Sequence, residues 1–332
     1  MQAQEIILAS RPEGMPTQAN FSLKQLELPP LKPGEFLVKN LWMSVDPYMR
    51  GRMIDRESYI APFALGEALE GGAIGEVIES NHEGFPVGSK VSSMKGWRSH
   101  YVTDGTDHTL LPDTPLSESH FLGVLGMPGM TAWTGLNRIA QLKAGETLFV
   151  SAASGAVGSV ACQLGLLMGA KVVASVGSDE KAEALKAMGI QQVINYKTTP
   201  NLSQALKAAA PQGVDVYFEN VGGEHLAAAL DNMNDHGRIA VCGMIAQYND
   251  TAPTPGPSNL AYIIMKKLRV EGFIVFEHWE HYGEFAQQMS EWLASGKVKA
   301  EQTIYEGLEN APAAFIGLFE GKNRGKMVVK LA

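Results

Sequence analysis

One short segment of the chain limits most narrowly the fold that the sequence can adopt. The apolar run Thr147-Leu-Phe-Val150 leads into a turn with the spacing Ala153-x-Gly155-x-x-Gly158. Residues 161–168, rich in Ala, Leu and Gln, have a helical pattern, and a β-branched run follows at 171–176. Strand, glycine turn, helix and second strand together predict one βαβ unit.

The same turn is a candidate phosphate-binding site. Glycines let the backbone approach a pyrophosphate closely, and the amides and positive dipole end of the following helix face its charge. Ala153 stands where the usual G-x-G-x-x-G pattern has its first glycine, so the motif is degenerate. A loop that only packs the helix on a sheet is the alternative. The flanking strand and helix favour dinucleotide binding.

Length and composition exclude other classes of protein. A chain of 332 residues exceeds the size at which one hydrophobic core usually stops growing, so we expect two domains. The net charge of −8 and the lack of a Lys/Arg block argue against nucleic-acid binding. Two cysteines, Cys162 and Cys242, exclude a disulfide framework and favour the cytoplasm. No signal pattern and no run of about 18 apolar residues occurs, so we expect neither secretion nor membrane spanning.

The pattern of the sequence changes near residue 125. Before it, short apolar runs such as 36–39 and 72–78 alternate with Pro and Gly clusters, which predicts a mostly β, antiparallel domain over 1–124. Over 125–296 apolar runs alternate with helical patterns, which predicts a doubly wound parallel α/β sheet. Its strands are expected at 193–196, 214–218, 238–242 and 269–275, with a helix at 282–294. Residues 297–332 are expected to return to the first domain with a closing strand at 326–331.

Motifs spread along the whole chain indicate a family. They are Val45-Asp-Pro-Tyr-Met-Arg50, Gly126-Met-Pro-Gly-Met-Thr-Ala132, Ser154 to Gly158, Glu219-Asn-Val-Gly-Gly223 and Gly307-Leu-Glu-Asn-Ala-Pro312. With them the chain resembles the zinc-independent medium-chain dehydrogenases/reductases, in the group of prostaglandin reductases, alkenal double-bond reductases and NADPH-dependent curcumin reductases. The resemblance implies a GroES-like, mostly β catalytic domain, a Rossmann domain, a cleft between them and a homodimer.

The sequence lacks the metal ligands of zinc-dependent relatives. Those relatives use cysteine, histidine and glutamate ligands in the first domain, whereas this chain has no cysteine before Cys162. His278 and His281 lie three residues apart, but no further Cys or His lies nearby in the sequence. We interpret them as surface histidines and expect no bound metal.

The end of the second strand of the βαβ unit selects between NADH and NADPH. An acidic residue there hydrogen-bonds a free ribose hydroxyl and repels a phosphate. Gly177 and Ser178 occupy this place, and Lys181 follows one turn into the next helix, which favours NADPH. The alternative is that Ser178 only caps the helix, and the acidic pair Asp179 and Glu180 argues against a phosphate.

The resemblance supplies the rest of the cofactor site. It implies that Lys181 and Tyr196 surround the phosphate of the adenosine ribose. It also implies that NADPH is lined by Thr131, Gly155, Ala156, Val157, Gly158, Asn220, Cys242, Gly243, Met244, Ile245, Tyr248, Phe273, Ile274, Val275 and Asn323. Each of these residues also has a purely structural alternative as a cap, a turn or a core residue.

Two tyrosines are the candidate catalytic residues. Reduction of a conjugated C=C bond needs a hydride at the β carbon, a donor near the carbonyl oxygen and a proton for the α carbon. Tyr48 and Tyr248 lie in motifs where related reductases place tyrosines around the substrate, although from the residues alone packing is the favoured role. Tyr262 is a weaker alternative. Arg50 and Arg52 either bind a substrate carboxylate or lie at the surface or at a domain contact.

The predicted activity is the NADPH-dependent reduction of α,β-unsaturated ketones or aldehydes to the saturated carbonyl compounds, by hydride transfer to the β carbon. NADPH-dependent quinone reduction on the same fold is one alternative. The other is a non-catalytic protein that binds NADPH, which the fold by itself does not exclude.

Overall fold

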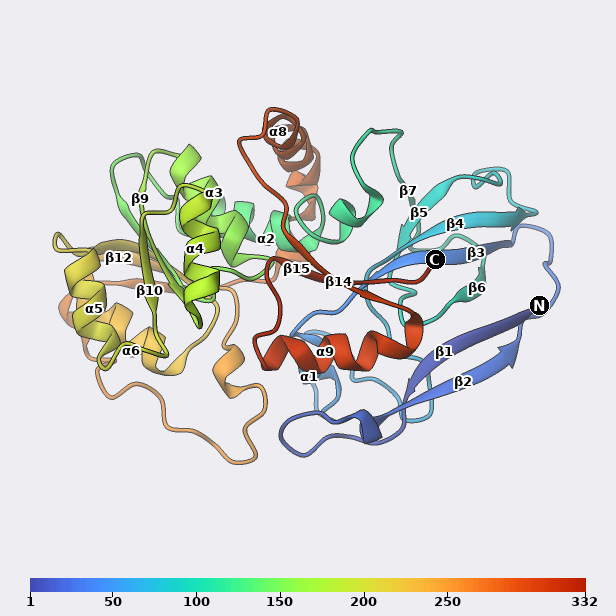
Figure 1. Ribbon diagram of the computed structural model, residues 1–332, viewed down its shortest axis with the longest axis horizontal. Coiled ribbons are helices and arrows are strands. Elements are labelled where there is room, and N and C mark those ends of the chain that lie inside the picture. The colour runs from blue at the N-terminus through green and yellow to red at the C-terminus, as the bar shows by residue number, and fades with distance from the viewer. The chain divides into compact units, whose positions relative to one another are not determined.

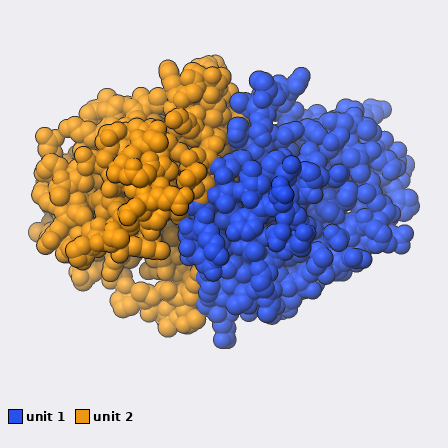
Figure 2. Space-filling model, viewed as in Figure 1, with its two compact units in different colours: residues 1–122, 302–323, 327–332 blue, residues 123–301, 324–326 orange.

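The computed structural model describes residues 1–332 and divides them into two compact units (Figure 2). Unit 1 comprises residues 1–122, 302–323 and 327–332, and unit 2 comprises residues 123–301 and 324–326. The expected functional domains, 1–124, 125–296 and 297–332, stay a prediction.

Unit 1 is built from antiparallel strands (Figure 1). β3 (Phe36–Ser44) pairs with β15 (Lys326–Lys330), β4 (Ala73–Ser80) and β6 (His100–Thr103), and β5 (Lys90–Ser93) joins β4 to β7 (Thr109–Leu110). β14 (Gln302–Glu306) borders β15, while β1 (Gln2–Leu8) and β2 (Phe21–Glu27) form a separate pair. The helices of unit 1 are η1 (Gln18–Asn20), α1 (Met49–Arg52), η2 (Glu118–Leu122), η6 (Leu308–Asn310) and α9 (Ala311–Phe319). The predicted mostly β, antiparallel architecture is confirmed.

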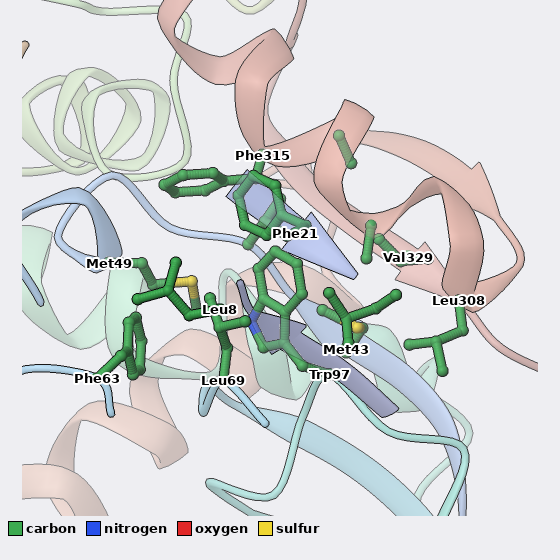
Figure 3. Packing of buried hydrophobic residues seen from close by; sticks show 14 of the residues in the cluster. Leu8, Phe21, Met43, Met49, Phe63, Leu69, Trp97, Leu308, Phe315 and Val329 are labelled. Atoms are coloured by element: carbon green, nitrogen blue, oxygen red, sulfur yellow. The ribbon is translucent and has the colours of Figure 1, made fainter. Parts of the chain in front are cut away.

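The core of unit 1 centres on three aromatic rings (Figure 3). Trp97 stacks on Phe21 with ring centroids 5.8 Å apart, and the Phe315 ring meets both of them edge-on. Met43 of β3 and Val329 of β15 belong to the same buried cluster. Phe315 lies on α9, so the end of the chain supplies an essential part of the core formed by its beginning.

Unit 2 is a six-stranded sheet in which every pair of neighbours is parallel (Figure 1). The spatial order is β10 (Gln192–Asn195), β9 (Lys171–Val176), β8 (Thr147–Val150), β11 (Val214–Glu219), β12 (Met233–Val241) and β13 (Arg269–Gly272). This is the doubly wound order of dinucleotide-binding sheets. The helices of the unit are α2 (Met127–Thr134), η3 (Gly135–Ile139), α3 (Gly158–Leu167), α4 (Asp179–Ala187), α5 (Leu202–Ala209), α6 (Gly223–Asn232), η4 (Ile245–Gln247), α7 (Tyr262–Met265), η5 (Val275–His281) and α8 (Tyr282–Ala294).

Two strands of unit 2 differ from the expected bounds by more than one residue. β12 begins at Met233, five residues before the expected Arg238, because Met233 already pairs with Val214 before an irregularity in the register. β13 ends at Gly272, where its pairing with β12 stops, so residues 273–275 lie beyond the strand. This second correction matters for the site, because it places these residues at the carboxyl end of the sheet.

Candidate active site

The carboxyl ends of the parallel strands lie along one edge of the sheet, and the direction of strand addition reverses between β8 and β11. Ser151 follows β8 and Asn220 follows β11. The Asn220 backbone N–H donates to Ser151 Oγ over 3.0 Å, and Asn220 Nδ2 donates to the Ser151 carbonyl over 2.7 Å. Open α/β sheets bind their ligands at this reversal point. The two residues therefore fix the backbone where we expect a dinucleotide.

The glycine turn after β8 is tightly closed. Ala152 has a φ of 47°, and its carbonyl accepts a hydrogen bond from the Gly155 N–H over 3.0 Å. A Cβ at Gly158 would lie 2.8 Å from the Ala153 Cα and nearer still to the Ala152 oxygen. Ala153 itself has no positive φ, since the left-handed residue of the turn is its predecessor. This explains why alanine is tolerated where the usual motif has its first glycine.

Hydroxyl and ammonium groups gather at the end of β9. Ser178 caps α4, with its Oγ accepting from the Lys181 N–H over 3.3 Å, as the capping alternative predicts. Burial and, next, the nearby Lys197 ammonium lower the pKa of Lys181. A Cβ at Gly177 would lie 2.9 Å from the Tyr196 hydroxyl oxygen and 3.4 Å from Lys197 Cε. We call Gly177, Ser178, Lys181, Tyr196 and Lys197 the cationic corner. Two cations and two hydroxyls around a residue without a side chain fit a phosphate.

The acidic pair beside the cationic corner is engaged elsewhere. Asp179 accepts a hydrogen bond from Asn195 Nδ2 over 2.7 Å. Glu180 lies 3.4 Å from Arg324, and its side chain is 82% exposed. Neither residue occupies the strand end where an acid that binds a free ribose hydroxyl would lie, so the acidic pair does not argue against a bound phosphate.

Sequence reasoning did not identify Lys197. The residue follows Tyr196 directly after β10, and β10 is the neighbour of β9 in the sheet. Both strands end at the same edge, so a basic residue after the third strand of a βαβαβ pattern was the signal that could have revealed it.

The loop after β12 folds back onto the end of β11. The N–H groups of Cys242 and Gly243 donate to the Glu219 carbonyl over 2.9 and 3.1 Å, and the Ile245 N–H donates to the Asn220 carbonyl over 3.1 Å. Burial raises the pKa of the Cys242 thiol to about 12, so this thiol stays neutral. The structure thereby brings together six predicted cofactor residues: Asn220, Cys242, Gly243, Met244, Ile245 and Tyr248.

Glu219 is a second residue that sequence reasoning missed as part of the site. It is fully buried, and its Oε1 accepts from the hydroxyls of Tyr217 and Ser151 and from the N–H groups of Val221 and Gly222. Its Oε2 has no hydrogen-bond partner. Burial raises the pKa of this carboxyl. A charged residue at the end of a buried apolar strand was the available signal, and the structure shows that Glu219 holds the turn after Asn220.

The remaining predicted cofactor residues lie in four places. Thr131 is buried in α2, where its hydroxyl donates to the Met127 carbonyl over 2.7 Å. Phe273, Ile274 and Val275 follow β13, and Ala156 and Val157 lie in the glycine turn before α3. Asn323 belongs to unit 1 and directly precedes the segment 324–326 of unit 2, in which the Gly325 N–H donates to the Ser154 carbonyl over 2.8 Å. The contacts of all these residues with a cofactor stay a prediction.

The two candidate catalytic tyrosines belong to different units. Tyr48 directly precedes α1 in unit 1 and is half-buried beside the core of that unit. Burial and then the charge of Asp46 raise the pKa of its hydroxyl well above the usual value, so it stays protonated. Tyr248 directly follows η4 in unit 2, and its hydroxyl accepts from the Met244 N–H over 3.4 Å. Their action on one substrate stays a prediction.

The structure corrects the surface interpretation of two arginines. Arg50 and Arg52 are both buried. Arg50 donates to the Gly14 carbonyl over 2.9 Å, and Arg52 donates to the Ala61 carbonyl and to Glu70 Oε2, each over 2.8 Å. Burial of so polar a group requires such partners, which explains their position. These bonds hold the segments that surround Tyr48.

Three other candidates have structural surroundings. Tyr262 packs against the core of unit 2, with the Lys266 ammonium 4.6 Å from its ring centroid. His281 lies 3.5 Å from Glu280, and His278 is half-buried in η5.

No group of three or more His, Cys, Asp or Glu side chains is arranged to hold a metal ion. None of the helices has the length and apolar character needed to cross a membrane.

Known proteins are similar to this chain in sequence and in fold over nearly its whole length. A family model described as the N-terminal domain of oxidoreductase matches residues 4–111, and one described as zinc-binding dehydrogenase matches residues 156–295. Prostaglandin reductase 1 of Mus musculus is 45% identical over 341 residues, covering 99% of each chain. The NADP(+)-dependent 2-alkenal reductase of Nicotiana tabacum is 42% identical, covering 99% of this chain and 97% of its own.

The crystal structure of CurA from Vibrio vulnificus in complex with NADPH superimposes with a TM-score of 0.94 at 43% identity, covering 99% of each chain. Likeness of this extent in sequence and in structure includes both units of the chain. The chain belongs to the medium-chain dehydrogenase/reductase family, in the group of the prostaglandin, alkenal double-bond and curcumin reductases.

Proposed function

We propose that this protein reduces the C=C bond of α,β-unsaturated ketones or aldehydes with NADPH, delivering hydride to the β carbon. The observation that carries the proposal is the cationic corner at the end of β9, where the Tyr196 hydroxyl and Lys197 Cε surround the position of the missing Gly177 side chain, and where burial and, next, the Lys197 ammonium lower the pKa of Lys181. Two neighbouring ammonium groups suit the double negative charge of a phosphate better than a neutral ribose hydroxyl. The tobacco 2-alkenal reductase and the NADPH complex of CurA support the same cofactor and bond type.

The residues of unit 2 fit the successive parts of NADPH. The glycine turn and the first amides of α3 would hold the pyrophosphate, because the N-terminal amides of a helix have no partner within it. The cationic corner would hold the 2′-phosphate. Asn220 and the loop 242–248 would border the nicotinamide half at the strand-order reversal. When bound, NADPH supplies the hydride.

Tyr48 and Tyr248 are the proposed catalytic residues. Hydride addition to the β carbon places negative charge on the carbonyl oxygen, and a hydroxyl donor at that oxygen stabilises it. Tyr248 would orient the enone or donate to this oxygen. Tyr48 is protonated because burial raises the pKa of its hydroxyl, and this hydroxyl would pass its proton to the α carbon and take up another from solvent. Both roles rest on hydroxyl chemistry, so tyrosine-to-phenylalanine variants test them directly.

The decisive experiment is turnover of an electrophile panel with stereospecifically deuterated NADPH. The panel contains alkenals, cyclic enones, diarylheptanoid enones and quinones. The expected product is a saturated carbonyl compound with deuterium on its β carbon, and Tyr48→Phe and Tyr248→Phe are expected to lower kcat more than they raise KM. Turnover of quinones alone would replace the proposal by quinone reduction. NADPH binding without oxidation of any panel member would indicate a non-catalytic role.

We also propose that the protein is a homodimer that pairs through unit 2. β13 is an edge strand of the sheet, and its Val270 is 42% exposed. Ile264, Met265, Phe276 and Trp279 on neighbouring segments are exposed as well. An unpaired edge with apolar neighbours is a surface that proteins usually cover. Analytical ultracentrifugation should show a dimer for the wild type and a monomer for Val270→Arg; a monomeric wild type would contradict the proposal.

The cytoplasm is the proposed compartment, with no nucleic acid as a partner. Both cysteines are free thiols, and the net charge is −8. A reducing compartment keeps thiols free, and an acidic surface repels phosphate backbones. Cell fractionation and an electrophoretic shift assay with DNA and RNA test these two statements.

A further inference from the structure

Unit 2 buries a histidine that no part of the proposed cofactor contacts uses. His225, in the first turn of α6, is 5% exposed, and a hydrogen bond of 2.8 Å joins its Nε2 to Ser175 Oγ of β9, which is also buried. Burial lowers the pKa of this histidine to about 4, so its ring is neutral near neutral pH. A buried polar pair costs stability compared with apolar residues of the same volume unless it is well hydrogen-bonded.

The His225 ring supports Tyr196. The two ring centroids are 4.9 Å apart and the ring planes are inclined by 79°, which is the favourable edge-to-face arrangement. Tyr196 is otherwise at the surface, with 38% of it exposed, because it follows β10 at the edge of the sheet. The contact with His225 therefore restricts a side chain that would be mobile without it.

Ser175 connects this pair to the rest of the site. Its carbonyl accepts the Ala153 N–H of the glycine turn over 3.0 Å, while its hydroxyl holds His225. The backbone N–H of His225 donates to the Gly222 carbonyl over 3.1 Å, next to the turn that carries Asn220. One buried pair thus joins the glycine turn, the turn after β11 and the tyrosine of the cationic corner.

We propose that His225 is a positioning residue that sets the preference for NADPH over NADH by holding the Tyr196 ring toward the 2′-phosphate. The inference rests on the proposed function, since it requires that the cationic corner binds this phosphate. His225 contacts the Tyr196 ring, and its effect on the phosphate passes through that ring. Without the histidine ring, Tyr196 samples other rotamers and the cost of ordering it is paid at each binding event.

The test compares a ligand that carries the 2′-phosphate with one that lacks it. Binding of 2′,5′-ADP and of 5′-AMP to the full-length protein is measured by isothermal titration calorimetry, together with kcat/KM for NADPH and NADH. His225→Ala is expected to weaken 2′,5′-ADP about five- to tenfold and 5′-AMP less than twofold. Equal weakening of both ligands, or of neither, would overturn the proposal.

A second variant guards against misfolding. In the double variant His225→Phe with Ser175→Ala an aromatic ring remains beside Tyr196 and both hydrogen-bonding partners are removed together, which is the substitution that buried pairs tolerate best. It is expected to retain the wild-type ratio of 2′,5′-ADP to 5′-AMP affinity within twofold. Loss of the ratio in this variant, with circular dichroism like that of the wild type, contradicts a role for ring support.

Two controls separate this inference from the function on which it rests. Lys181→Ala tests the cationic corner itself, and an unchanged ratio there would refute the phosphate assignment and not the support of Tyr196. His100→Ala in unit 1 removes another histidine that is hydrogen-bonded to a serine, over 3.1 Å to Ser99. The ratio is expected to be unchanged in His100→Ala. A matching change there would show that His225→Ala acts through general destabilisation.

Discussion

The close contact at Gly158 leads to a quantitative prediction for Gly158→Ala. The new Cβ would meet the backbone of the glycine turn, 2.8 Å from the Ala153 Cα. Ordinary contact begins at 3.4 Å, so the Ala153 Cα must move by at least 0.6 Å, the difference between the two distances, and the nearer Ala152 oxygen must move farther. No flexible side chain can absorb this shift, because the atoms in contact belong to the main chain of Ala152 and Ala153.

The cost follows from three contributions. Overpacking of a closed site costs about 1–3 kcal/mol. Displacing the Ala152 carbonyl weakens its bond to the Gly155 N–H, which adds about 1 kcal/mol. Alanine is a better helix former than glycine, and Gly158 begins α3, so up to about 1 kcal/mol is recovered. We therefore expect unfolding free energy to fall by about 2 kcal/mol.

Gly155→Ala is the matched control in the same turn. There the new Cβ would lie 3.2 Å from the Ala152 oxygen, which requires a shift of only 0.2 Å to reach 3.4 Å. Its φ is not positive, so alanine also reduces the entropy of the unfolded chain. Stability is expected to stay within about 1 kcal/mol of the wild type. NADPH binding should still weaken, because the methyl group keeps the pyrophosphate away from the backbone.

Urea unfolding followed by circular dichroism measures the stability of both variants without cofactor, and NADPH fluorescence measures binding. Equal stability of Gly158→Ala and the wild type would refute the packing argument. Undiminished NADPH affinity in Gly155→Ala would refute close approach of the pyrophosphate at this position. The two results are independent, since one concerns the folded chain and the other its ligand.

Three further predictions concern the polar residues of unit 2. Lys197→Ala should weaken NADPH binding by roughly three- to tenfold and leave NADH binding unchanged in calorimetry, because only NADPH carries the 2′-phosphate. Burial lowers the pKa of His225 from 6.5 to about 4, so the folded state is most stable with respect to this group above pH 6.5, where the ring is neutral in both the folded and the unfolded chain. About 3 kcal/mol of this stability should be lost as the pH falls to about 4. Urea titrations at several pH values should show this loss in the wild type and not in the double variant His225→Phe with Ser175→Ala. Glu219→Ala should cost roughly 3 kcal/mol, since Val221 and Gly222 N–H groups lose their acceptor, and Glu219→Gln, which keeps an oxygen, should cost less in the same titration.

Local patterns were sufficient for the framework of the site. The βαβ unit from Thr147 to Val176 has two short apolar runs, a glycine turn and a helical pattern, and each of these signals acts within a few residues. Ser178 was recognised as a cap because helix caps are local as well. Lys181 was recognised from its place one turn into the helix after β9, and family likeness added Tyr196, which follows β10, a strand that becomes the neighbour of β9 only in the folded sheet.

Other features depend on contacts between distant segments. The early start of β12 follows from its pairing with β11, and the buried arginine Arg50 is satisfied by the carbonyl of Gly14 in a different loop. A sequence shows that an arginine is present but not that distant carbonyls enclose it, so the surface interpretation was the natural one and was wrong. Burial of a charge is decided by its partners, and those are set by the tertiary fold.

Two of the residues that escaped sequence reasoning, Glu219 and His225, share one physical role. Glu219 and His225 are buried polar groups, and each is hydrogen-bonded to a residue that follows or belongs to a different strand: Ser151 for Glu219 and Ser175 for His225. Such bonds are strong only in a dry interior and costly when broken, so they hold loops at fixed positions without contacting a ligand. It follows that exchanging the cationic corner for residues of an NADH enzyme should leave an incomplete switch, because the support of the loops would still be that of a phosphate site.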